Sequence, residues 1–63
     1  MTSSAAAEIS SISSQIEELM KRVTSIGDQY RATPDSQLVT ECNSAERSLM
    51  SAIRAMDRAK KHV

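Results

Sequence analysis

The residue types that most often carry chemistry in proteins are sparse in this chain. Its 63 residues include one histidine, His62, one cysteine, Cys42, and one glycine, Gly27. A metal site or a nucleophile–base pair needs several such side chains close together, and His62 lies beside the last residue, where helices fray. A lone glycine cannot build a glycine-rich phosphate loop. We therefore expect no catalytic residue, no metal site and no cofactor, and we predict that the protein is not an enzyme.

The charge of the chain also argues against nucleic acid and membranes as partners. Eight Lys and Arg residues balance eight Asp and Glu residues, so no net field draws the chain to a polyanion. Arg54, Arg58, Lys60 and Lys61 make the last turns basic, but a helix dipole favours cations there, and no aromatic side chains accompany them for base stacking. No secretory signal or spanning segment is evident, and a lone cysteine suits a reducing compartment. We expect a cytoplasmic protein that binds neither nucleic acid nor membrane.

The composition favours helices. Phe and Trp are absent and Tyr and Pro occur once each, whereas strands favour aromatic residues. Ala, Glu, Met, Lys and Arg are all good helix formers, and we predict an all-α fold.

Two heptad patterns indicate where the helices lie. In each, apolar residues recur at alternating spacings of three and four, which keeps one stripe of a helix facing a partner helix. Within the second pattern, Cys42 is predicted to act as a small buried hydrophobe rather than a reactive thiol. The first pattern comprises Ile9, Ile12, Ile16, Leu19, Val23, Ile26 and Tyr30, and the second comprises Leu38, Cys42, Ala45, Leu49, Ala52, Met56, Ala59 and Val63.

The segment between the two patterns predicts a turn. Pro34 disfavours helical geometry at the residue before it and suits the first position of a new helix, and Thr33 is the predicted N-cap. A short connection between helices of equal length favours antiparallel neighbours. We predict one two-helix antiparallel coiled-coil hairpin over residues 1–63, with helix 1 at about 5–31, a turn at 32–33 and helix 2 at about 34–62.

Folding the chain at this turn also predicts which residues meet. Paired residue numbers should sum to about 65, so that Val23 meets Cys42. Arg22 and Glu41 should meet across the seam. The predicted centre of the seam comprises Ile12, Ile16, Leu19 and Leu49.

The two flanks of the predicted seam differ in polarity. One flank is polar, whereas the other carries large apolar side chains, and the apolar arc of helix 2 is wider than one facing helix can cover. Surplus apolar surface is typical of an interface, although Met20 and Met50 overhanging the edge of the core would also explain it. We predict that a partner binds the apolar flank through Met20, Val39, Met50 and Ile53.

The second helix carries a segment that resembles a known family. A hairpin of this length, a proline turn leading into a Gln-containing helix start at residues 34–38, and the run Glu46-Arg47-Ser48-Leu49-Met50-Ser51-Ala52-Ile53 are similar to the small co-chaperones of the type III secretion needle subunit, the YscE/PscE-like family. The resemblance implies a cytoplasmic protein that binds a helical-repeat chaperone. It also implies that the pair keeps the needle subunit soluble before export.

Two further interpretations stay open. The hairpin could self-associate into a four-helix-bundle homodimer with a scaffolding or regulatory role. It could also be a needle-like subunit, although such a subunit should carry a polymerising C-terminal tail, and this chain stops at Val63.

Overall fold

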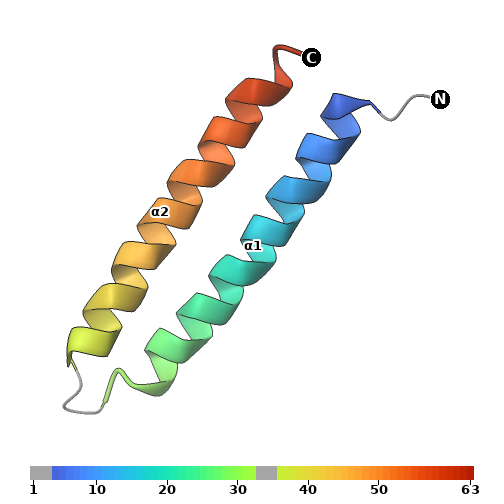
Figure 1. The fold of residues 1–63 in the computed structure, drawn as a ribbon. Helices are drawn as coiled ribbons and strands as arrows, with labels where there is room; N and C mark the ends of the chain where they lie inside the picture. The colour runs from blue at the N-terminus through green and yellow to red at the C-terminus, as the bar shows by residue number, and fades with distance from the viewer. Residues whose placement is uncertain (1–3, 33–35) are drawn as a thin grey trace.

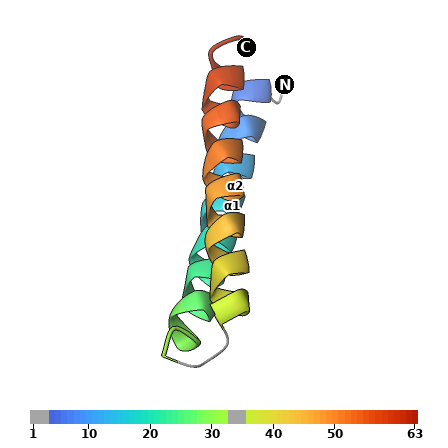
Figure 2. The ribbon, with the colours of Figure 1, turned by 90° about the vertical axis from the view of Figure 1, so that its left-hand side faces the viewer.

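The computed structural model describes residues 4–32 and 36–63, which form two long helices lying side by side (Figure 1). Helix α1 spans Ala5–Gln29 and helix α2 spans Ser36–Lys60, with 25 residues each. The helices run antiparallel and contact each other along the hairpin (Figures 1 and 2). The prediction of an all-α antiparallel helical hairpin is confirmed.

Both helices end slightly earlier than their predicted ends at about 31 and 62. At the end of α1, the Tyr30 N–H donates to the Gly27 carbonyl at 3.3 Å, and the Arg31 N–H donates to the Asp28 carbonyl at 3.4 Å. These i→i−3 bonds form a tighter, 3₁₀-type turn that ends the α-helix. Residues 61–63 follow α2 with the same type of bond.

The start of α1 has a well-formed cap. Ser4 adopts an extended backbone, and its hydroxyl oxygen accepts a hydrogen bond from the Ala7 N–H at 3.0 Å. The Glu8 carboxylate in the first turn complements the helix dipole. The predicted cap of the second helix, Thr33, and the neighbouring Pro34 lie outside the described residues.

The hairpin is a single layer without an enclosed core. Its Cα atoms extend over 52 × 17 × 9 Å, and the radius of gyration is 14.9 Å, whereas a compact domain of this length would have about 11 Å. Among the described residues no apolar side chain is fully buried, and Gly27 is the only buried residue. Stable domains usually enclose a core between packed layers, and two helices by themselves provide only a line of contact.

The helices pair in a different register from the predicted one. A Cβ atom added to Gly27 would lie 3.5 Å from the Cβ of Cys42, and the Thr24 hydroxyl donates a hydrogen bond to the Glu46 carboxylate. The paired numbers therefore sum to 69 and 70, which shifts α1 relative to α2 by more than one helical turn away from the connection. The physical reason is that Gly27 has no side chain, so α1 can lie close to α2 opposite Cys42, where the prediction had placed Val23.

Helix α1 is also rotated about its axis relative to the prediction. Ile9, Ile16 and Val23 are half-buried, as the heptad pattern predicts. In contrast, Ile12, Leu19 and Ile26 are 39%, 46% and 44% exposed, so Ile12 and Leu19 do not lie in the central seam. Small side chains facing α2 permit closer helix packing than a row of Ile and Leu would. The inner stripe of α1 consists of Ala6, Ile9, Ser13, Ile16, Met20, Val23 and Gly27.

The predicted contact between Arg22 and Glu41 is wrong. The Glu41 carboxylate instead accepts a hydrogen bond from the Gln37 side chain at 2.9 Å within α2. No ion pair joins Arg22 to Glu41 in residues 4–32 and 36–63, because the shifted register carries the two side chains to different levels of the hairpin.

The close approach at Gly27 leads to a stability prediction. A Cβ atom there would make ordinary van der Waals contact with Cys42, and alanine favours a helix over glycine by about 0.5–1 kcal/mol. Gly27→Ala should therefore raise the thermal midpoint by a few degrees in circular dichroism melts, whereas Gly27→Leu, with a side chain too large for the gap, should lower it. A lower midpoint for Gly27→Ala would show that the helices lie closer than this geometry.

Candidate protein-interaction surfaces

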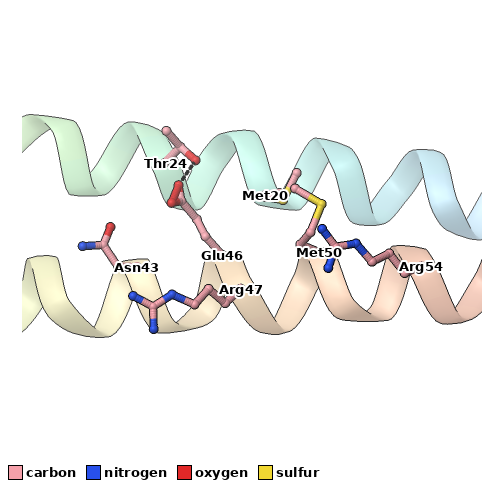
Figure 3. A pocket seen from close by; sticks show the side chains of 7 residues that line it. All are labelled: Met20, Thr24, Asn43, Glu46, Arg47, Met50 and Arg54. Carbon is pink, nitrogen blue, oxygen red and sulfur yellow. Dashed lines mark hydrogen bonds between the residues drawn. The ribbon is translucent and has the colours of Figure 1, made fainter.

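Two shallow grooves run along the hairpin, one on each side of the line where the helices meet. The first, which we call the Met20–Met50 groove, has a volume of about 590 Å³ and is shown in Figure 3. Its α1 wall is Met20 and Thr24. Its α2 wall comprises Asn43, Glu46, Arg47, Met50 and Arg54.

The Met20–Met50 groove combines an apolar centre with a basic rim. The side chains of Met20 and Met50 lie next to each other between the helices, and the Thr24–Glu46 hydrogen bond closes one end of the apolar part (Figure 3). The Arg54 guanidinium lies beside the two methionines, and the Arg47 side chain extends along α2 toward Asn43 (Figure 3). Flexible thioethers adapt to varied apolar partners, so this groove suits an apolar side chain with an acidic neighbour.

The structure brings together two of the four residues predicted to bind a partner. Met20 and Met50 line the same groove, and Met50 is 40% exposed. Val39 and Ile53 are half-buried and do not line the groove. They lie seven residues on either side of Glu46, and so on the same stripe of α2 as a groove residue. The predicted contact set therefore lies along one side of the hairpin, with Met50 its most exposed member.

Sequence reasoning missed the polar part of this groove. Thr24 and Glu46 join the helices across the groove, but the predicted register of about 65 placed them at different levels. The available signal was the spacing of Glu46 from Val39 and Ile53, since residues seven apart share a helix stripe.

The second groove lies on the opposite side of the layer. It has a volume of about 340 Å³ and is lined by Leu19, Arg22, Val23, Ile26 and Leu49. Arg22 in this groove and Thr24 in the first are about 200° apart around α1, which places them on opposite sides. Ile12 continues the line of Leu19 and Ile26 at the same seven-residue spacing. We call Ile12, Leu19 and Ile26 the isoleucine–leucine row.

The remaining chemical groups form no reactive cluster in the described part of the chain. No set of three or more His, Cys, Asp or Glu side chains is placed to hold a metal ion there. Cys42 is a free, half-buried thiol beside Gly27. Neither α1 nor α2 has the length and apolar character that crossing a membrane requires.

Comparison with known proteins gives no relative: no protein-family model, curated protein or solved structure matches this chain.

The Thr24–Glu46 bond gives a prediction about polar packing. Glu46→Ala should lower the free energy of unfolding by about 1 kcal/mol, because the part-buried Thr24 hydroxyl loses its acceptor. Combining Thr24→Val with Glu46→Leu should restore stability, since both polar partners are then replaced by apolar groups. Urea unfolding of Thr24→Val, of Glu46→Leu and of the double variant measures this coupling, and simple additivity would contradict it.

Proposed function

We propose that the protein is a non-enzymatic interaction hairpin, whose apolar surface is covered when it packs against a protein partner. Its exposed area supports this proposal. A compact folded monomer of 6.9 kDa exposes roughly 4,000 Å², whereas this hairpin exposes 4730 Å². Three exposed Ile and Leu side chains on one side and an exposed Met on the other contribute to this area. Apolar surface left exposed in this way is typical of interaction sites.

The resemblance to the YscE/PscE-like co-chaperones specifies this proposal further. A helical-repeat chaperone presents a concave surface in which a helical hairpin can lie. We propose that such a chaperone binds this protein in the cytoplasm through Met20, Val39, Met50 and Ile53, and that the complex holds the needle subunit unpolymerised. Burial of a filament subunit in a complex opposes its assembly by mass action.

Co-expression tests this function directly. The hairpin would be produced with the helical-repeat chaperone and the needle subunit of the source organism's secretion system. A stable complex of the three chains, with the needle subunit soluble only when all three are present, is the expected result. A soluble complex of chaperone and needle subunit that forms without the hairpin and does not bind it would overturn the co-chaperone role. Filaments formed by the hairpin alone would indicate the needle-like alternative.

A second candidate function is self-association as a scaffolding or regulatory module. The observation that favours it is the isoleucine–leucine row, which lies on the side of the hairpin opposite the Met20–Met50 groove. A homodimer through this row would leave that groove accessible.

A further inference from the structure

We infer that the isoleucine–leucine row binds a second copy of this chain, and that the two hairpins stack as two layers of a four-helix bundle. The inference rests on one part of the proposed function, namely that the chain is a protein-interaction module. It assigns a residue-level interface and an orientation to the homodimer.

The size of the uncovered surface fits this occupant. The hairpin exposes roughly 700 Å² more than a compact monomer of its mass. Each partner in a standard protein interface buries about 800 Å². A second copy that buries about 800 Å² on each hairpin would therefore bring the exposed area of each hairpin close to that of a compact monomer of its mass. It would also enclose Leu19, Ile26 and Leu49, which now line an open groove.

The same side of the hairpin offers a surface on which the row can pack. Each step along a helix turns by about 100°, so Ser48 and Met50 project to opposite sides of Leu49. Because Met50 lines the first groove and Leu49 the second, Ser48 belongs to the side of the isoleucine–leucine row. From residue 44 onward the α2 residues on this side are small, whereas Gln37 and Glu41 lie on the same side nearer the connection. The small residues are Ser44, Ala45, Ser48, Ala52, Ala55 and Ala59. This side of the hairpin thus pairs a ridge of large side chains on α1 with a shallow strip on α2.

A ridge beside a strip of small residues is self-complementary under one particular two-fold rotation. If the axis runs parallel to the helices between the layers, α1 of each copy lies antiparallel on α2 of the other. Large side chains then pack on small ones in two equivalent contacts, as an isologous interface requires. An axis that also lies between the layers but runs perpendicular to the helices would place the ridge of one copy against the ridge of the second. Both strips would then stay uncovered.

The register within the hairpin agrees with this packing. The Gly27–Cys42 and Thr24–Glu46 pairs place Leu19 level with residues 50 and 51, and Ile12 level with residues 57 and 58. Rotation about an axis parallel to the helices preserves these levels. Leu19 then lies over Ser48 and Ala52 of the second copy, and Ile12 lies between its Ala55 and Ala59. Leu19 and Ile12 thus meet small residues at their own levels, and by the same count Ile26 lies between Glu41 and Ala45 of the second copy.

Light scattering during size-exclusion chromatography tests the interface. The wild-type chain should have the mass of two copies, against 6.9 kDa for one. Leu19→Glu and Ser48→Glu should each reduce the mass to one copy, because both side chains are exposed in the hairpin and the charge would be buried only in the dimer. Asn43→Glu adds the same charge to an exposed residue of the Met20–Met50 groove and should remain dimeric.

Cysteine cross-linking tests the orientation in a Cys42→Ser background. Mixing Leu19→Cys with Ser48→Cys should give a disulfide between the two variants, whereas Leu19→Cys alone should give little bridged dimer. A wild-type monomer at every concentration, a dimer that survives both glutamate variants, or an efficient disulfide between two copies of Leu19→Cys would overturn the inference. A monomer that still forms the chaperone complex would overturn only the homodimer and leave the proposed function standing.

Discussion

Replacing Leu49 with alanine should lower the free energy of unfolding by about 2 kcal/mol. A Leu→Ala change in a core costs about 2–5 kcal/mol, and the half-buried position of Leu49 places its cost at the lower end. A chain this small has few kcal/mol of stability in total, so much of the variant should be unfolded when dilute. Urea unfolding followed by far-ultraviolet circular dichroism measures the loss.

Leu19→Ala is the matched control for this experiment. The heptad pattern places Leu19 and Leu49 together in the seam, and so predicts similar losses. The structure leaves Leu19 46% exposed and predicts less than half the loss of Leu49→Ala at a dilution where the chain is monomeric. Equal losses of stability in the monomer would instead support the heptad prediction, in which Leu19 lies at the centre of the seam. A loss for Leu19→Ala that grows with protein concentration would instead reflect the dimer interface.

The fold was predictable because its signals are local and agree with one another. The spacing of apolar residues defined two helices, and the single proline between them defined the turn. An antiparallel arrangement followed from the short connection. The cap at Ser4 and the early ends of the helices were the details that the apolar pattern could not supply, since they depend on hydrogen bonds of individual backbone groups.

The rotation of α1 was not predictable from the heptad alone. The heptad pattern selects the most hydrophobic stripe of a helix as its contact surface. It therefore predicts that Ile12, Leu19 and Ile26 face α2. Close packing also rewards small residues at the contact, and Ser13 and Gly27 satisfy this on the neighbouring stripe. A stripe that is strongly apolar yet exposed in the single chain is expected when the complete fold contains more than one chain. The disagreement between pattern and structure thus identifies a candidate interface.

Substituting Met50 and Ile53 together with glutamate should abolish binding of the proposed helical-repeat chaperone. Met50 is 40% exposed in the Met20–Met50 groove, and Ile53 lies on the adjoining stripe of the same helix. Burying two unpaired carboxylates in an apolar interface costs several kcal/mol, and a loss of about 2.7 kcal/mol already weakens binding about a hundredfold. Pull-down with the purified helical-repeat chaperone, with circular dichroism of the variant to verify its helices, measures the effect.

The matched control adds two carboxylates to α2 away from this groove. Thr40 and Ser51 are exposed and line neither groove, so Thr40→Glu with Ser51→Glu should retain the complex. Met50→Glu alone should weaken binding while disturbing the hairpin least, because Ile53 is half-buried against α1 and Met50 is not. If the Met50 and Ile53 double variant stays helical and still captures the chaperone as well as wild type does, the partner binds elsewhere. The isoleucine–leucine row would then be the surface to test next, with Leu19→Glu in the same pull-down.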